Sequence, residues 1–196
     1  MENQINKLHI AAFSTNPTFY IPYSLFNIYL EKTIHRNSLT SKDNNFKFMF
    51  SVAGTKYLAN IHPITNLEKV EDICSFVDCA LILIDLENQS SKESCEKIAY
   101  YIKDNIQSDK KVYALGLTTD KSNNVSSFTE KDINNLMEEQ NFLYDYKEVC
   151  SNEKSEVTSA IEYILSDNIE IFSDCQRHST MELNLNLCKS NPCIVY

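Results

Sequence analysis

Apolar and polar positions along the chain follow two periods, which predict alternating strands and helices. Continuous or alternating apolar runs predict strands over Lys7 to Ser14, Phe46 to Ala53, Cys79 to Asp85, Lys111 to Leu117 and Phe142 to Val149. Apolar residues at helical spacing predict helices over about Tyr23 to His35, Asn66 to Phe76, Ser90 to Ile106, Thr129 to Gln140 and Glu153 to Leu165. This order predicts an α/β domain with a mostly parallel sheet flanked by helices.

Helix boundaries and the end of the domain are marked by single residues. Ser90 with Glu93 has the spacing of a capping box, and Thr129 with Asp132 marks the start of a further helix. The helical period stops after Leu165. The sequence therefore predicts one domain over residues 1–166 and a flexible tail over residues 167–196.

Composition narrows the classes of function. The 196 residues carry a formal net charge of −9, which argues against a nucleic-acid partner because phosphate binding needs clustered Lys and Arg. No apolar run is long enough to span a bilayer and the polar N-terminus does not resemble a signal peptide, so we expect a cytoplasmic protein. The seven cysteines form no CxxC pair, and those inside predicted elements are expected to be buried.

Polar segments follow the predicted strands in a fixed order. Val52-Ala53-Gly54 ends one strand, an Asp85 turn follows the next, Leu117-Thr-Thr-Asp120 follows the fourth and Cys150-Ser151-Asn152 the last. These segments resemble motifs of Ras-superfamily small GTPases, most closely the Rab family. In chain order they resemble the end of the DTAG motif, the turn before a serine-capped helix, the GNKxD motif and the SAK motif. The resemblance covers Lys7 to Leu165. It implies a three-layer P-loop-GTPase-like (Ras-like) fold, with Gly54, Asp120 and Ser151 as vestigial nucleotide-binding residues.

The departures from these motifs predict lost chemistry. The segment His9 to Leu25 has neither the glycines nor the lysine of a phosphate loop, and Pro17 and Pro22 lack amide donors. Ser51 and Thr55 align with the family's magnesium-anchoring aspartate and catalytic glutamine, whereas Leu117, Thr118 and Asn152 replace base-binding residues. The short interval from Ile34 to Phe46 predicts a shortened second strand and switch region, with Thr40 as its switch threonine.

The leading functional hypothesis is a Rab-like pseudo-GTPase. It is a binding module for trafficking or scaffold proteins, with no catalytic residue, metal or cofactor. A second hypothesis is an atypical GTPase that binds GTP or GDP with magnesium through Ser14, Thr15, Asn16 and Thr18. A third is a soluble structural subunit with no membrane role. A flavodoxin or response-regulator fold is disfavoured because residues 11–15 offer neither acidic residues nor a flavin-phosphate loop.

The last residues predict a lipid anchor. Cys193-Ile-Val-Tyr196 fits a CaaX box, which predicts prenylation at Cys193, with Cys188 as a second lipid site. A single prenyl chain binds membranes only weakly, and the tail has no polybasic stretch. The alternation of Met181, Leu183, Leu185 and Leu187 with polar residues predicts an extended segment that docks on its own domain, on a partner or on a prenylation escort. We therefore expect the cytoplasmic face of a membrane as one location.

Overall fold

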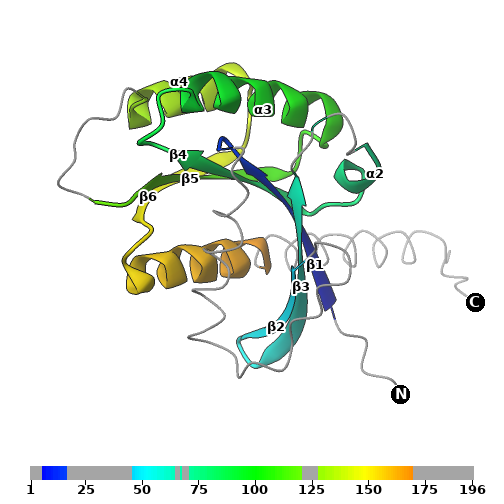
Figure 1. Cartoon of the computed structure of the whole chain (residues 1–196). Coiled ribbons are helices and arrows are strands. Elements are labelled where there is room, and N and C mark those ends of the chain that lie inside the picture. The colour runs from blue at the N-terminus through cyan, green and yellow to red at the C-terminus, as the bar shows by residue number, and fades with distance from the viewer. Residues whose placement is uncertain (1–5, 17–45, 65–66, 68–70, 121–127, 170–196) are drawn as a thin grey trace, which may run out of the picture.

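A six-stranded sheet forms the centre of the molecule. The computed structural model describes residues 6–16, 46–64, 67, 71–120 and 128–169. The strand order is β2-β3-β1-β4-β5-β6; every neighbouring pair is parallel except β2 and β3, which are antiparallel (Figure 1). The strands are β1 (Asn6–Ser14), β2 (Phe46–Val52), β3 (Thr55–Ile64), β4 (Cys79–Asp85), β5 (Lys111–Thr118) and β6 (Tyr144–Cys150).

Helices cover both faces of this curved sheet. On one face lie α2 (Glu71–Cys74), α3 (Ser91–Asn105) and α4 (Glu130–Glu139), and a helix over residues 154–169 lies on the other (Figure 1). We call the latter the terminal helix. The prediction of an α/β domain with a mostly parallel sheet flanked by helices is confirmed. The five parallel strands, β3-β1-β4-β5-β6, have the 2-1-3-4-5 order of flavodoxin-like domains, and β2 is added as an antiparallel edge strand. The strand order therefore leaves that alternative open, and only the residues of the segment 11–15 disfavour it.

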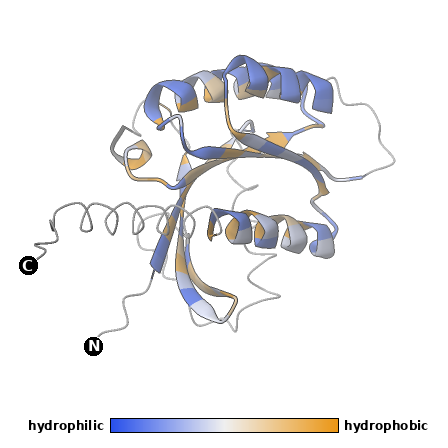
Figure 2. Cartoon of the chain, turned by 180° about the vertical axis from the view of Figure 1, so that it is seen from behind, coloured by the Kyte–Doolittle hydropathy of each residue, from blue (hydrophilic) through white to orange (hydrophobic). Residues whose placement is uncertain are grey.

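Two hydrophobic cores sandwich the sheet because successive side chains of a strand point to opposite faces. In β4, Leu81 and Leu83 belong to the core under the terminal helix, whereas Ile82 and Ile84 belong to the core under α3 and α4. Both faces of this strand are buried, as its continuous apolar run predicts. The hydropathy colouring accordingly shows apolar residues on the sides of the helices that face the sheet (Figure 2).

The main correction to the expected elements lies between residues 46 and 64. β2 pairs with Thr55 to Ile61 of β3 through a tight hairpin whose two central residues, Ala53 and Gly54, have positive φ angles of 48° and 81°. Such a turn is the ordinary two-residue connection of a β-hairpin. The sequence analysis missed β3 and took β2 for the third strand. The expected shortening of the second strand is therefore wrong, because all seven residues of β2 are paired with β3.

Helix ends give one confirmed and two incorrect predictions. Thr129 and Asp132 begin α4 as predicted, and they do so through a reciprocal capping box. Ser90 makes no capping bond, because its hydroxyl donates to Asn88 Oδ1 at 2.9 Å. The terminal helix does not stop at residue 165: Asn168 Nδ2 donates to Ile164 O at 2.7 Å and Ile169 is buried, so residues 167–169 pack with the domain.

Four cysteines fall in the part of the chain that the structure describes. Cys74, Cys79, Cys95 and Cys150 are all free and buried, as predicted. Burial raises the pKa of the Cys95 thiol to about 12, so this group stays protonated and unreactive at neutral pH. The expected helix over Tyr23 to His35, the switch threonine Thr40 and the tail with Cys188 and Cys193 lie outside the described residues.

Candidate functional site at the carboxyl ends of the strands

The topology of the sheet points to one edge as the place for a ligand. From β1 the chain goes to one side, forming β2 and β3, and then returns past β1 to form β4 and the remaining strands. In open α/β sheets, ligands bind outside the carboxyl ends of the strands, where the connections diverge in this way. The candidate site therefore lies at the ends of β1 and β4, with the ends of β5 and β6 beside it (Figure 1).

Thr15 bridges the ends of β1 and β4. Its amide donates to Leu83 O at 2.9 Å, and its hydroxyl accepts a 3.0 Å hydrogen bond from the amide of Asp85. The same hydroxyl lies 2.9 Å from Ser91 Oγ, at the first turn of α3. Thr15 is 1 % exposed and Ser91 is 0 % exposed. The Thr15 hydroxyl therefore has neutral polar partners in place of water.

The carboxylate of Asp85 has partners on both sides. One oxygen accepts a 2.9 Å bond from Asn16 Nδ2, and the other accepts a 3.1 Å bond from the amide of Glu87. Ser14 and Asn16 also bond to each other through the Ser14 hydroxyl and the backbone of Asn16. The first residues after β1, which the atypical-GTPase hypothesis assigns to phosphate, are thus engaged with β4 or with one another, whereas Thr18 lies outside the described residues.

Glu87 links the ends of β4 and β5. Its Oε1 accepts bonds of 2.6 Å from both the amide and the hydroxyl of Thr119. These bonds from the hydroxyl and the amide, assisted by the amide of Asp120, hold the pKa of the Glu87 carboxyl below its usual range. The acidic side chain is therefore ionised at neutral pH and directed at the loop that follows β5.

Asp120 and Ser151, two of the three predicted nucleotide-binding residues, lie close together at the ends of β5 and β6. Ser151 donates from both its amide and its hydroxyl to Thr118 O, at 2.8 and 3.0 Å. Asn152 Nδ2 donates to Thr119 O at 2.9 Å, and the exposed Asp120 follows directly. Ser151 and Asn152 thus bond to the backbone of the loop that carries Asp120.

Gly54, the third predicted residue, lies at the opposite edge of the sheet. It occupies the hairpin turn before β3, which runs parallel to β1, so Gly54 sits beside the amino end of β1. Ser51 and Thr55 flank the same turn, and their alignment with the magnesium and water positions of the resembling family is wrong. Gly54 supplies the positive φ angle that the turn requires.

Gly116, the other glycine of the chain, has a packing role within β5. A Cβ atom at this position would collide with the hydroxyl of Tyr146 and would lie 2.9 Å from Leu86 Cδ1. The missing side chain makes room for a tyrosine from the neighbouring strand β6.

A small cavity adjoins the candidate site on the α3 side of the sheet. It has a volume of about 230 Å³ and lies between the ends of β1 and β3 and the first turns of α3. Lys97 lines it, but its ammonium group is 2.7 Å from the carboxylate of Glu93. The volume falls below the roughly 300–1,000 Å³ of typical ligand pockets.

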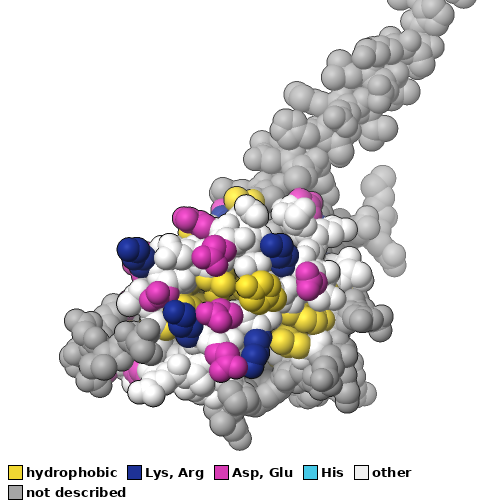
Figure 3. Space-filling model, turned by 90° about the horizontal axis from the view of Figure 1, so that it is seen from above, with side chains coloured by type: hydrophobic (Ala, Val, Ile, Leu, Met, Phe, Trp, Pro, Cys, Tyr) yellow, Lys and Arg dark blue, Asp and Glu magenta, His cyan; other side chains and the backbone are white. Residues whose placement is uncertain are grey.

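The outer surface of α3 and α4 carries acidic and basic side chains interspersed around a small apolar area (Figure 3). Tyr100, on α3, is 56 % exposed. Among the residues that the structure describes, no group of three or more His, Cys, Asp and Glu side chains is arranged to hold a metal ion. Within those same ranges, no helix has the length and apolar character needed to cross a membrane.

Sequence reasoning missed Glu87 and Ser91 as members of this edge. Both lie within two residues of a predicted strand end or helix start, and that position was the available signal. Their bonding partners come from other strands and therefore depend on the strand order. No protein-family model matches the sequence, and no curated protein is significantly similar to it.

Proposed function

We propose that this chain is a Rab-like pseudo-GTPase, a binding module that keeps the scaffold of a small GTPase without its nucleotide chemistry. The strand order, with β2 antiparallel at one edge, is compatible with a P-loop-GTPase-like sheet. The single observation that carries the proposal is the bonding of the carboxyl-end polar groups to one another. Thr15, Asp85 and Glu87 form hydrogen bonds with groups at the ends of neighbouring strands, and these bonds hold the strand ends together.

The corrected strand assignment leaves the argument from the motifs unchanged. The residues that follow β3 now take the place of the DTAG motif, and the segment Pro63-Ile-Thr-Asn-Leu67 contains no aspartate, glycine or glutamine. A magnesium anchor and a water-positioning amide both need such side chains. The base pocket keeps Asp120, but Ser151 and Asn152 are bonded to backbone carbonyl groups.

The partners in this proposal are trafficking or scaffold proteins. The chain meets them at a membrane, to which its own C-terminal lipid sites anchor it. Cys193 is the prenylated residue and Cys188 the second site. The net charge of −9 favours partner surfaces that are basic. Expression in eukaryotic cells followed by intact mass measurement tests the anchor, with Cys193→Ser and Cys188→Ser as matched variants; an unmodified C-terminus would remove it.

The pseudo-GTPase proposal is tested by searching the purified native protein for nucleotide. We expect no stoichiometric GDP or GTP in the supernatant after denaturation and no saturable binding of fluorescent GTP or GDP analogues with magnesium. A functional small GTPase purified in parallel controls for loss during purification. Stoichiometric co-purified nucleotide would support the atypical-GTPase hypothesis instead.

A further inference from the structure

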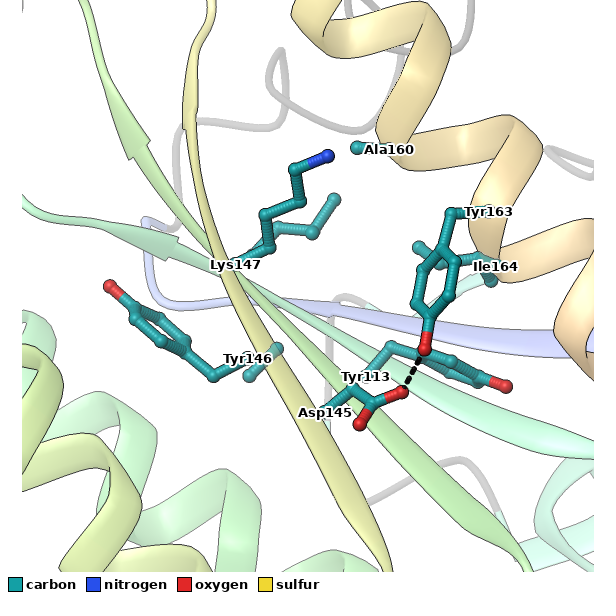
Figure 4. A pocket seen from close by; sticks show the side chains of 9 residues that line it. Tyr113, Asp145, Tyr146, Lys147, Ala160, Tyr163 and Ile164 are labelled. Atoms are coloured by element: carbon teal, nitrogen blue, oxygen red, sulfur yellow. Dashed lines mark hydrogen bonds between the residues drawn. The ribbon is translucent and has the colours of Figure 1, made fainter.

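A groove lies between the edge strand β6 and the terminal helix, away from the candidate site. Its volume is about 300 Å³, and Leu115, Ala160 and Ile164 supply apolar walls. Tyr163 and Asp145 form one rim, where the tyrosine hydroxyl donates to the carboxylate (Figure 4). Lys147 extends across the other side toward Ala160 (Figure 4). The groove is thus an apolar trough with polar rims.

One side of the groove is an unpaired strand edge within the part of the chain described. β6 is the last strand of the sheet and pairs with β5 alone. Val112 N donates to Leu143 O, and Ser151 N donates to Thr118 O, so the odd-numbered residues of β6 direct their backbone groups at β5. The backbone groups of Tyr144, Tyr146 and Glu148 consequently point outward, where another strand could pair with them.

Exposed apolar side chains mark the same edge. Leu143, directly before β6, is 57 % exposed, and Tyr163 on the terminal helix is 46 % exposed. The Asp145 carboxylate at the rim is paired with Lys111, whose Nζ lies 2.6 Å away and is shared with Asp167 at 2.7 Å. Lys147 adds a second positive charge to the lining of the groove, so the apolar surface carries little excess negative charge, which suits aliphatic side chains.

We propose that residues 181–187 of this chain dock on this edge as an added strand beside β6. The segment Met181-Glu-Leu-Asn-Leu-Asn-Leu187 alternates apolar and polar residues with a period of two. A strand paired with β6 directs its apolar set to one face and its polar set to the other. The methionine and leucines enter the groove beside Ala160 and Tyr163, and Asn184 and Asn186 lie on the opposite, solvent-facing side.

The chain is long enough to make this return within one molecule. The terminal helix is described to Ile169, and residues 170–180 provide an eleven-residue connection. At about 3.3 Å per residue this connection spans up to roughly 36 Å. The groove around Ala160 lies only about 14 Å back along the helix, at about 1.5 Å per residue. An intramolecular partner is also present at a high effective concentration.

Docking places Cys188 directly after the added strand and leaves Cys193 five residues further along the chain. The bound tail therefore holds one candidate lipid site against the domain, whereas the other can still reach a modifying enzyme. The aliphatic stem of Lys147 can lie along the docked leucines with its ammonium group in water. This inference does not depend on whether the chain binds nucleotide.

Hydrogen exchange of the full chain tests the proposal at single amides. We expect the amides of Tyr144, Tyr146 and Glu148 to exchange at least about tenfold more slowly than in a Leu183→Asp/Leu185→Asp variant. The matched control is Asn184→Asp/Asn186→Asp, which adds the same charge on the other side of the strand and should keep the protection. Both variants change residues outside the predicted domain of residues 1–166, so a failure to fold is not expected.

Three results would overturn the inference. The first is equal exchange of the β6 amides in all three proteins. The second is protection that grows with protein concentration, because it would assign the groove to a second copy of the chain. The third is protection confined to the outer edge of β2. Slow exchange that is independent of concentration and lost only in the leucine variant supports docking within one molecule.

Discussion

The two ends of the parallel strands are held together by different interactions. At the carboxyl ends, the hydroxyls of Thr15 and Ser151 and the exposed carboxylate of Glu87 bond to backbone groups of neighbouring strand ends. At the amino end of β5, Lys111 Nζ lies 2.6 Å from Asp145 and 2.7 Å from Asp167, which joins two strands to the terminal helix. The carboxyl edge therefore fixes loop positions, whereas the amino edge fixes a helix through charge.

Charge at the amino edge is only partly exposed to water. The side chain of Lys111 is 13 % exposed. Tyr113, on the same strand as Lys111, donates a hydrogen bond to Asp167. Burial alone lowers the pKa of Lys111, but the hydrogen bonds to Asp145 and Asp167 outweigh it and raise the pKa overall. Burial raises the pKa of Asp145, but bonds from Lys111 and Tyr163 outweigh it, so the net shift is downward. Both shifts favour the charged pair in the folded state.

Removing the shared cation should have the largest effect. Lys111→Met leaves two carboxylates facing each other without a counter-charge, so we expect a loss of about 3 kcal/mol in the free energy of unfolding. Urea denaturation at neutral pH measures it. Lys97→Met is the matched control, because the Lys97–Glu93 pair is exposed on both sides and should contribute less than about 0.5 kcal/mol. Equal losses in the two variants would contradict the contrast between the edges.

The carboxyl edge is best probed by removing one buried hydroxyl. Thr15→Val keeps the shape of the side chain but leaves the amide of Asp85 without its partner, and Ser91 loses its own. We expect a loss of about 2 kcal/mol, measured by the same denaturation. Ser14→Ala, at a half-buried neighbour, should cost less, and an effect as large as that of Thr15→Val would mean that backbone strain dominates here.

Lowering the pH should reduce stability through a histidine pair between β1 and β3 before it affects the charged groups at the amino edge. His9 Nδ1 lies 3.1 Å from His62 Nε2. Burial, with the charges of His9 and Lys47, lowers the pKa of His62 to about 4. Because the unfolded chain binds this proton more readily, stability should fall by about 1–2 kcal/mol from pH 7 to pH 5.

His62→Gln should remove most of this loss of stability. The Lys111 cluster should persist over the same range, because a lowered Asp145 pKa costs stability only below about pH 4. It weakens again as the pH rises above the ordinary lysine pKa of about 10.4 and through the raised pKa of Lys111. Urea midpoints across this range measure both effects, and a pH dependence unchanged in His62→Gln would assign the acid sensitivity elsewhere.

The smallest expected effect belongs to the exposed carboxylate of Glu87. Glu87→Gln keeps an acceptor for Thr119 but removes its charge, so the loss should be about 0.5–1 kcal/mol. The local consequence is more diagnostic: the amide of Thr119 should exchange faster with solvent, while the amides of β4 stay protected. Unchanged exchange at Thr119 would show that Glu87 does not hold this loop.

Local pattern predicted the elements that are either uniformly apolar or clearly capped. β4 and the Thr129–Asp132 capping box belong to this class, because their signals lie within a few residues. β3 was missed because four consecutive residues, Ala59 to His62, are buried and two of them are polar, which hides the period of two. Burial on both faces is a property of the sheet and cannot be inferred from this segment alone.

The candidate site was predicted in part for the same reason. Asp120 and Ser151 were placed correctly at strand ends because they follow apolar runs. Gly54 was misplaced because one missed strand moved it to the other edge. The partners of Glu87 and Asn16 lie 32 and 69 positions away in sequence, so only the strand order brings them together.

The central proposal is that the polar groups at the carboxyl ends of the described strands bond to one another in place of a nucleotide. Amide chemical shifts of the full chain, followed while GDP and then GTP are added with magnesium, test it directly. We predict no saturable shifts at Thr15, Asp120 and Ser151. Saturable shifts at these three amides with micromolar affinity would contradict the account and identify a working nucleotide site.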